Sequence, residues 1–525
     1  MPKVLISDDL SPAAVQIFRD RGVEVDIKTG LKPDELIAIV GNYDGLAIRS
    51  ATKVTAKVLE AATNLKVIGR AGIGVDNVDV PAATARGICV MNTPFGNAIT
   101  TAEHAIALMF ALARQLPQAD RSTQAGKWEK SRFMGTELYA KTLGIIGCGN
   151  IGSIVADRAL GLKMRVVAFD PFLSNERALE LGVEKVMLDD LLRRADFITL
   201  HTPLTDQTRN IINAENLAKC KKGVRIVNCA RGALVVEADL KAAMESGQVA
   251  GAAIDVFAVE PAKENILFGM DSLVATPHLG ASTAEAQENV ALQVAEQMSD
   301  YLLVGAVTNA LNMPSVSAEE APKLQPYMKL AGELGSFAGQ LVESGPKKIN
   351  IEYEGHVATL NTRPLSAVAL QGLLQPLLES VNMVNAPVIA RERNIDVAET
   401  THDRAGDYHT LIRITVVDGG AERVVAGTLF GDRRPRLIQI DDIKVEAELG
   451  PHMLFLENED KPGFIGRLGS VLGAAGINIA TFHLGRAAPG GKAIALVEVD
   501  GPIPDKVLAE VRTLPMVRRA AALDF

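Results

Sequence analysis

Short apolar runs without polar alternation recur along the first half of the chain, and helical patterns separate them. The early runs occupy residues 4–7 and 45–48 and the segment LKVIGRAG that starts at Leu65. After a longer helical stretch, further runs occupy residues 166–170, 197–201, 225–228 and 251–256 and the segment that starts at Leu273. Strands of this kind are buried on both faces, and helices between them favour parallel pairing. The pattern therefore predicts an α/β fold built on doubly wound parallel sheets.

Two longer segments carry the period of a packed helix. In the first, residues 100–116, one stripe holds Ala105, Leu108, Met109, Leu112 and Leu116. The second begins with a capping box of Ser282 and Glu285, and its apolar face holds Val290, Val294, Met298 and Tyr301. We expect the second helix to return the chain to the first domain.

The length of 525 residues implies two to four domains. Pro and Ser with little periodicity mark a boundary within residues 309–322. Residues 316–450 mix helical and strand-like runs, which suits a small α+β domain. From residue 451 the order is strand, Pro-Gly turn, helix, strand, strand and helix.

Charge and cysteine content exclude several classes of function. The net charge is −9, without a long basic run, so we expect no nucleic-acid partner. The four cysteines lack the close spacing of zinc or redox motifs, and we predict no metal site and mostly buried, reduced thiols. No signal segment or long apolar stretch is found, so we expect a cytoplasmic protein without membrane contact.

A glycine motif indicates a dinucleotide site. Gly147, Gly149 and Gly152 form GxGxxG between the strand-like LGII and a helical run, and Asp170 ends the next strand. Such a turn brings backbone N–H groups at a helix N-terminus to a pyrophosphate, while the acid accepts from ribose hydroxyls. The carboxylate would repel a 2′-phosphate, so the cofactor predicted is NAD. The alternative is a glycine turn that serves only close packing.

Three polar residues follow later strands and suit the oxidation of an alcohol. Arg231, Glu260 and His278 each lie just past a predicted strand, where open α/β sheets bind ligands. We assign His278 as the acid/base, Glu260 as the carboxylate that orients it, and Arg231 as the anchor for a substrate carboxylate. Taken singly, each has a plain alternative as a surface or capping residue.

Together, GCGNIG with Asp170, NCARGALV, AAIDVFAVEP and PHLGAST resemble the D-isomer-specific 2-hydroxyacid dehydrogenase family. The resemblance implies two Rossmann-like domains around a cleft: a substrate-binding domain of residues 1–98 with 282–315, and an NAD-binding domain of residues 99–281. It also implies further cofactor contacts from Asn150, Ile151, Thr202, Cys229, Ala230, Asp255, Gly280 and Ala281, beside Arg231 and His278.

Within that family, LAIRSATKVT, IGRAGIGVDNVD and NTPFGN resemble the branch that acts on phosphoglycerate in serine biosynthesis. Arg49 is the first choice for the substrate phosphate, because guanidinium forms bidentate bonds to it. Arg70 is the second choice, with a structural salt bridge as its alternative. The resemblance also implies that the backbone from Gly72 to Gly74 approaches the substrate carboxylate.

The C-terminal segment ENEDKPGFIGRLGSVLGAAGINI is similar to the ACT domain, a βαββαβ ligand-sensing module with a ferredoxin-like fold. Residues 316–450 resemble the intervening domain of the long members of the same branch. The resemblance implies an allosteric homo-oligomer, expected to be a tetramer, with an L-serine effector at Asn458, Asp460 and Asn478. Some relatives carry His where this chain has Asn458, and Asp460 and Asn478 have an alternative as turn formers.

Two other functions are compatible with these motifs. The first is reduction of another 2-oxo acid, such as hydroxypyruvate, glyoxylate or 2-oxoglutarate, in which Arg49 would bind a carboxylate or nothing. The second is a nicotinamide-sensing interaction protein of the corepressor type. That role would not need the acid/base pair to work and offers no place for the ACT-like segment.

Overall fold

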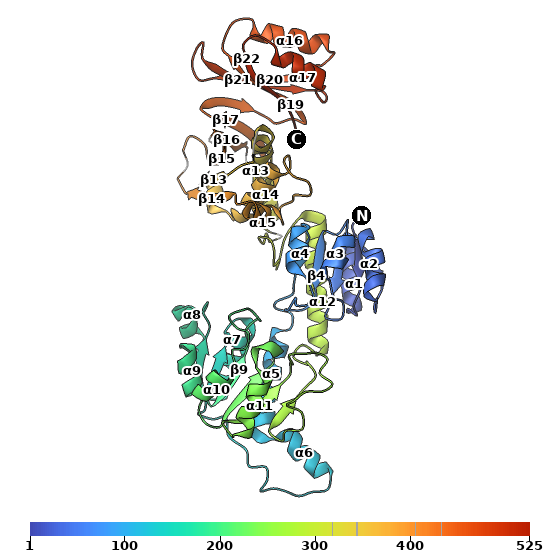
Figure 1. Cartoon of the computed structure of the whole chain (residues 1–525), viewed down its shortest axis with the longest axis vertical. Helices are drawn as coiled ribbons and strands as arrows, with labels where there is room; N and C mark the ends of the chain where they lie inside the picture. Colours follow the sequence, from blue (N-terminus) through green and yellow to red (C-terminus); the bar gives the residue numbers. More distant parts are fainter. Residues whose placement is uncertain (318, 343–344, 405, 420, 432) are drawn as a thin grey trace.

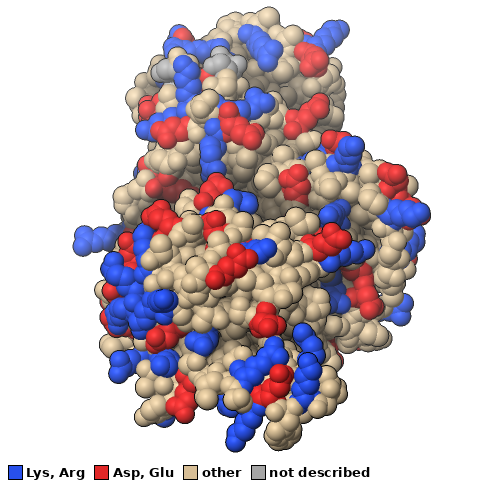
Figure 2. Space-filling view, turned by 60° about the horizontal axis from the view of Figure 1, so that its bottom comes forward, with Lys and Arg blue, Asp and Glu red and all other residues tan. Residues whose placement is uncertain are grey.

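The computed structural model describes residues 1–317, 319–342, 345–404, 406–419, 421–431 and 433–525. Four sheets, each with its own helices, follow one another along the long axis of the molecule (Figure 1). Within the described residues, no helix is both long and apolar enough to cross a membrane. All four cysteines are buried and none forms a disulfide. On the face in Figure 2, acidic and basic side chains are interspersed around a wide area with few charges.

The N-terminal lobe, shown in blue in Figure 1, is built on a parallel sheet. Its strands are β1 (Lys3–Ile6), β2 (Glu24–Ile27), β3 (Gly45–Ile48), β4 (Val67–Arg70) and β5 (Cys89–Met91), in the order β2-β1-β3-β4-β5. The connecting helices are α1 (Pro12–Asp20), α2 (Pro33–Ile39), α3 (Ala56–Ala61) and α4 (Val80–Ala85), with a 3-10 turn at Val40–Asn42. Every strand pair is parallel, as the apolar runs predict.

A helix from much later in the chain completes this lobe. Helix α12 (Ala284–Val304) crosses the sheet and buries Val290, Val294 and Met298 against it. The helix can approach the sheet this closely because Gly69, on β4, has no side chain: a Cβ there would lie 2.2 Å from the sulfur of Met298. The predicted cap was wrong by one residue, because Thr283 is the N-cap and its hydroxyl accepts from the amide of Ala286.

The second lobe, here called the glycine-loop lobe, contains a parallel sheet in the order β12-β11-β10-β9-β6-β7-β8. Its strands are β6 (Thr142–Ile146), β7 (Arg165–Phe169), β8 (Glu184–Lys185), β9 (Phe197–Leu200), β10 (Val224–Asn228), β11 (Val249–Ile254) and β12 (Leu273–Ala275). Its helices are α5 (Ala98–Arg114), α6 (Leu116–Gln124), α7 (Asn150–Gly161), α8 (Asn175–Glu180), α9 (Leu188–Arg194), α10 (Ala214–Lys219) and α11 (Glu237–Glu245), with a 3-10 turn at Gly232–Leu234. The order reverses between β6 and β9, which is where such sheets bind ligands.

One helix prediction in this lobe was wrong at its end. The stripe expected across residues 100–116 stops early, because Gln115 adopts a left-handed conformation with φ 53° and separates α5 from α6. Leu116 therefore leaves the stripe and is 53% exposed, whereas Leu108 and Leu112 are buried as expected.

The mixed-sheet domain follows, in the order β14-β13-β15-β16-β17-β18. Its elements are α13 (Ala321–Leu341), β13 (Lys348–Gly355), a 3-10 turn at His356–Thr359, α14 (Arg363–Leu374), α15 (Ala386–Glu392), β14 (Asp396–His402), β15 (Thr410–Asp418), β16 (Ala421–Phe430), β17 (Arg434–Ile440) and β18 (Ile443–Ala447). Only β13 and β14 pair in parallel. Helices α13 and α14 pack closely at glycines: a Cβ at Gly335 would lie 2.2 Å from the carbonyl oxygen of Ala369.

The C-terminal domain is an antiparallel sheet in the order β20-β21-β19-β22, covered by two helices. Its elements are β19 (His452–Glu459), α16 (Phe464–Ala474), β20 (Ile479–Arg486), β21 (Lys492–Val499), α17 (Asp505–Arg512) and β22 (Val517–Asp524). This is the βαββαβ order of a ferredoxin-like fold. Phe455 packs edge-on against Phe337 of α13, with ring centroids 5.9 Å apart, and joins this domain to the mixed-sheet domain.

Candidate active site

The predicted site residues of both lobes lie at the C-terminal ends of parallel strands. In the glycine-loop lobe, the glycine motif follows β6, Asp170 follows β7, and Arg231 follows β10. Glu260 lies in the loop after β11, and His278 lies just past β12. In the N-terminal lobe, Arg49 follows β3 and Arg70 ends β4. The remaining predicted contacts, all in the glycine-loop lobe, follow the ends of β6, β9, β10, β11 and β12: Asn150, Ile151, Thr202, Cys229, Ala230, Asp255, Gly280 and Ala281.

Each of the three glycines of the motif lacks a side chain for a different physical reason. Gly147 has φ 90°, and a Cβ there would lie 2.6 Å from the carbonyl oxygen of His201. Gly152 packs helix α7 on the loop, because its Cβ would lie 2.1 Å from the carbonyl oxygen of Gly147. Gly149 caps α7 and has no atom within 4 Å of an added Cβ. The open space therefore lies over a helix N-terminus, which fits a pyrophosphate.

Asp170 ties this loop to the neighbouring strand. One carboxylate oxygen accepts from the amide of Cys148 at 2.8 Å, and the other accepts from the amide of Phe172 at 2.8 Å. The carboxylate is partly exposed. It therefore has a local structural role in addition to the ribose contact that the motif predicts.

His201, at the end of β9, is held neutral beside the same loop. Burial lowers its pKa to about 4. One ring nitrogen, Nε2, lies 2.8 Å from the hydroxyl oxygen of Thr199. The other, Nδ1, is buried and has no hydrogen-bond partner in the described part of the chain.

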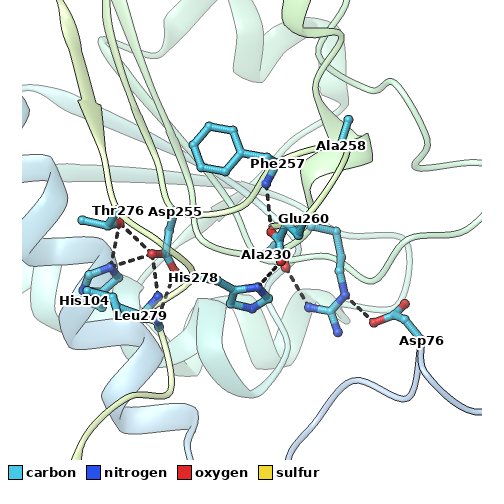
Figure 3. A network of polar contacts seen from close by, with 12 residues as sticks. Asp76, His104, Ala230, Asp255, Phe257, Ala258, Glu260, Thr276, His278 and Leu279 are labelled. Carbon is cyan, nitrogen blue, oxygen red and sulfur yellow. Dashed lines mark hydrogen bonds and ion pairs between the residues drawn. The ribbon is translucent and has the colours of Figure 1, made fainter. Parts of the chain in front are cut away.

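The structure brings His278 and Glu260 together, as Figure 3 shows. Nδ1 of His278 lies 2.7 Å from Oε2 of Glu260, and Oε1 of Glu260 accepts from the amide of Phe257 at 2.9 Å. The His278 side chain is 51% exposed, so its other nitrogen can meet a substrate. A histidine with one nitrogen on a carboxylate and the other exposed is suited to accepting a proton.

A buried carboxylate supports the turn that carries His278 (Figure 3). Asp255 is fully buried; its Oδ1 accepts from the hydroxyl of Thr276 at 2.6 Å and the amide of Leu279 at 2.7 Å, and its Oδ2 accepts from the amide of Gly280 at 2.9 Å. Burial opposes ionisation, but His104 and these donors outweigh it and hold the pKa of Asp255 below its ordinary value. His278 has φ 57°, and this network fixes that unusual backbone conformation.

His104 extends this network and was not anticipated from the sequence. Its Nε2 lies 3.3 Å from Oδ1 of Asp255 and 3.4 Å from the hydroxyl oxygen of Thr276. Cys229 is close enough to complete a possible metal triad with His104 and Asp255. Burial raises the pKa of the Cys229 thiol, and the oxygens of Asp255 already accept hydrogen bonds from the turn, so we assign this group to the support of that turn.

Arg231 reaches from the glycine-loop lobe to the N-terminal lobe. Its Nε donates to Oδ2 of Asp76 at 2.8 Å, and its Nη1 donates to the carbonyl oxygen of Ala230 at 2.7 Å. The remaining nitrogen, Nη2, lies against Gly74, where a Cβ would be only 1.7 Å away. Gly74 thus lets the guanidinium lie against the loop that was expected to approach the substrate carboxylate.

Arg70 and Arg49 lie near Arg231 and make this region cationic. Burial, followed by the charge of Arg231, lowers the pKa of Arg70 to about 10, and Arg49 adds to the effect. Nε of Arg70 is buried and has no hydrogen-bond partner among the residues that the structure describes. Nη1 of Arg49 donates to the carbonyl oxygen of Asp9 at 3.1 Å. A Cβ at Gly72 would lie 1.5 Å from Nη1 of Arg70, so that glycine makes room for the arginine.

The three predicted effector residues lie in the C-terminal domain and have local contacts. Asn458 is buried, and its Oδ1 has no hydrogen-bond partner within the described ranges. Asp460 accepts from Nη1 of Arg486 at 2.7 Å and from the amide of Gly490 at 3.0 Å, which lowers its pKa. Asn478 donates to Asp500 at 2.8 Å. The contacts of Asp460 and Asn478 fit their alternative as local structural residues.

Three family models match the chain in succession. Residues 106–280 match the D-isomer specific 2-hydroxyacid dehydrogenase NAD binding domain, residues 323–441 match the D-3-phosphoglycerate dehydrogenase intervening domain, and residues 452–515 match the ACT domain.

Relatives with curated names match over nearly their whole length. The D-3-phosphoglycerate dehydrogenase of Synechocystis sp. is 45% identical over 99% of this chain and 94% of that protein. The enzyme of the same name from Archaeoglobus fulgidus is 44% identical over 98% of each chain, and that from Bacillus subtilis is 40% identical over the whole of both.

Solved structures match a shorter part of the chain. A glyoxylate reductase from Paecilomyes thermophila is 31% identical with a TM-score of 0.56, covering 59% of this chain and 98% of its own. A D-lactate dehydrogenase from Aquifex aeolicus, complexed with NAD and lactic acid, is 25% identical with a TM-score of 0.53, covering 60% of this chain and 100% of its own.

Proposed function

The chain belongs to the D-3-phosphoglycerate dehydrogenase family, and we propose that it oxidises D-3-phosphoglycerate to 3-phosphohydroxypyruvate with NAD, the first step of L-serine biosynthesis. The observation that supports this most directly is the full-length match, in a chain whose acid/base pair, Glu260 and His278, lies at the strand ends. The relatives' names fit the cationic region around Arg49 and Arg70, since the substrate carries both a phosphate and a carboxylate.

Each polar group then has one task in the reaction. NAD, when bound, supplies the acceptor for the hydride that leaves the substrate carbon. His278 takes the hydroxyl proton on its exposed nitrogen, and Glu260 stabilises the imidazolium that results. Arg231 holds the substrate carboxylate together with the backbone from Gly72 to Gly74.

The cofactor is held by the glycine motif and Asp170. The N-terminus of α7 at Gly149 would hold the pyrophosphate, and Gly147 and Gly152 shape the turn before it. Asp170 accepts from the adenosine ribose. The other contacts that we assign to NAD are Asn150, Ile151, Thr202, Cys229, Ala230, Asp255, Gly280 and Ala281.

The phosphate is assigned first to Arg49 and second to Arg70. Nε of Arg70 is buried without a hydrogen-bond partner among the described residues, which favours Arg70 as a phosphate ligand, because such a donor is costly unless a ligand accepts from it. The two arginines lie at the ends of adjacent strands, β3 and β4, and we assign both to one cationic region that suits a dianion.

The domain division that we propose is residues 1–98 with 282–315 for substrate, 99–281 for NAD, 316–450 as the intervening domain and 451–525 as the ACT domain. An ACT domain suggests regulation by a small molecule. We propose L-serine as that molecule, with Asn458, Asp460 and Asn478 at its site, in a cytoplasmic homotetramer.

The test is turnover of D-3-phosphoglycerate with NAD, followed as NADH formation while the product is removed. D-glycerate, D-lactate and D-2-hydroxyglutarate are tested beside it. We expect the highest kcat/KM for the phosphorylated acid. His278→Asn should lose about 100-fold or more in kcat and still bind NADH, because Asn tolerates the left-handed backbone. A higher kcat/KM for any unphosphorylated acid would contradict the proposal.

A further inference from the structure

We propose that Asp76 is a positioning residue for Arg231, which it orients toward the substrate carboxylate when the two lobes are in contact. This inference rests on the proposed role of Arg231 as the carboxylate anchor. It does not depend on which 2-hydroxy acid is the substrate, because all of them carry that carboxylate.

The hydrogen bonds of Arg231 leave one nitrogen for a ligand. The carboxylate of Asp76 accepts a hydrogen bond from Nε at 2.8 Å, and the carbonyl oxygen of Ala230 accepts one from Nη1 at 2.7 Å. Two fixed nitrogens determine the plane of a guanidinium group, which is rigid and flat. The third, Nη2, then lies against Gly74, beside the backbone expected to meet the carboxylate. Without Asp76, the plane would be free to turn about the side-chain bonds.

The pair also connects two separate hydrophobic cores. Asp76 lies in the loop between β4 and α4 of the N-terminal lobe, whereas Arg231 follows β10 of the glycine-loop lobe. The two sheets bury their strands in different apolar clusters. Arg231 is therefore held from both sides only when the lobes meet, whereas Glu260 and His278 contact each other within the glycine-loop lobe alone.

The charge of Asp76 also suits this position. Arg231 and Arg49 repel the guanidinium of Arg70, while Asp76 attracts it. The Asp76 carboxylate thus offsets part of the repulsion among three arginines before an anionic substrate arrives. An asparagine would keep an oxygen for Nε and lose this charge.

A purely structural role is disfavoured by exposure. The Asp76 side chain is 63% exposed, and that of Arg231 is 30% exposed. Ion pairs with this exposure contribute little to folding stability. Loss of Asp76 should therefore change kinetics without changing the melting temperature.

The experiment compares Asp76→Ala and Asp76→Asn with the parent chain, using the full-length protein and its best 2-hydroxy acid. We expect kcat/KM to fall about 10- to 100-fold for Asp76→Ala, the scale of a misoriented substrate contact, and less for Asp76→Asn. NADH affinity and Tm should stay unchanged. The matched control is Asp300→Asn, which removes the negative charge from the Arg21–Asp300 pair in the same lobe and should leave kcat/KM unchanged.

A double-mutant cycle tests whether Asp76 acts through Arg231. In an Arg231→Lys background, Asp76→Ala should cost less than about 3-fold, because a lysine has no guanidinium plane to orient. An unchanged kcat/KM in the single variants would overturn the proposal. So would an equal loss in both backgrounds, or a loss that follows a fall in Tm. If D-3-phosphoglycerate is not the preferred acid, the function proposed above fails, and the cycle still decides the role of Asp76 with the preferred one.

Discussion

Two alanine substitutions three residues apart should have opposite consequences. In Gly152→Ala, the new Cβ would lie 2.1 Å from the carbonyl oxygen of Gly147 and 3.0 Å from its carbon. Both are backbone atoms, so helix α7 or the loop must move by about 1 Å. Overpacking of this kind costs about 1–3 kcal/mol. For a domain of this size that cost lowers Tm by about 2–10 °C.

Gly149→Ala should leave the fold almost intact and weaken cofactor binding strongly. Gly149 has φ −75°, outside the positive-φ region that favours glycine, and no atom lies within 4 Å of the new Cβ. The cost to the helix cap is about 1 kcal/mol or less. The methyl group would, however, occupy the space assigned to a phosphate oxygen. Losing two charge-assisted bonds costs about 3 kcal/mol or more, which weakens NADH binding by about 150-fold.

The measurements are thermal unfolding without cofactor and fluorescence titration with NADH, both on the full chain. The two variants control for each other, since each adds one methyl group to the same motif. If Gly149→Ala binds NADH as tightly as the parent, the pyrophosphate does not lie over the N-terminus of α7. If Gly152→Ala melts at the parent temperature, the close packing of the helix on the loop is not required.

Three further perturbations separate other roles. Asp170→Asn should lower the ratio of kcat/KM with NAD to kcat/KM with NADP by about 10-fold or more, because it removes the charge that repels a 2′-phosphate. An unchanged ratio would refute this. Arg49→Ala should lower kcat/KM for 3-phosphohydroxypyruvate by about 30- to 150-fold, from about 2–3 kcal/mol of lost contacts, and barely affect hydroxypyruvate; equal losses would assign Arg49 to the fold or the shared carboxylate. The pKa of His201 is lowered to about 4, so its stabilising contribution is complete above pH 6.5 and is lost as pH falls toward 4. That loss is about 2 kcal/mol at pH 5, and His201→Gln should flatten this part of a pH–stability profile measured by denaturant unfolding.

The sheets and the proximity of Glu260 to His278 could be predicted because their signals are local. Apolar runs specify strands buried on both faces, and parallel pairing puts Glu260 and His278 at one edge. The end of helix α5 at the left-handed Gln115 does not show in the apolar period; its sequence signal is Pro117, two residues later, because proline disfavours helix in the residues just before it. The helical period of the apolar residues alone extends the predicted helix to Leu116.

The contacts of Asp76 and His104 with residues distant in the sequence could not be predicted, because no sequence pattern marks them. Asp76 in a loop and His104 on a helix have the composition of ordinary polar surface positions. Their partners, Arg231 and Asp255, are 155 and 151 residues away along the chain, so only the tertiary fold brings them together. The same holds for Gly72 and Gly74, whose missing side chains make room for Arg70 and Arg231.

The return of helix α12 to the first sheet also sets an order of assembly during synthesis. The strands of the N-terminal lobe are made first, but the side chains of Val294 and Met298 that cover them arrive only when α12 is complete at Val304. By then β12, the last strand of the glycine-loop lobe, has already been translated, since it ends at Ala275. A nascent chain thus holds a finished second core while one face of the first is covered only in part, by α1. The uncovered part of that face, with Gly45 and Gly69 at its centre, is the surface that a ribosome-associated chaperone would meet.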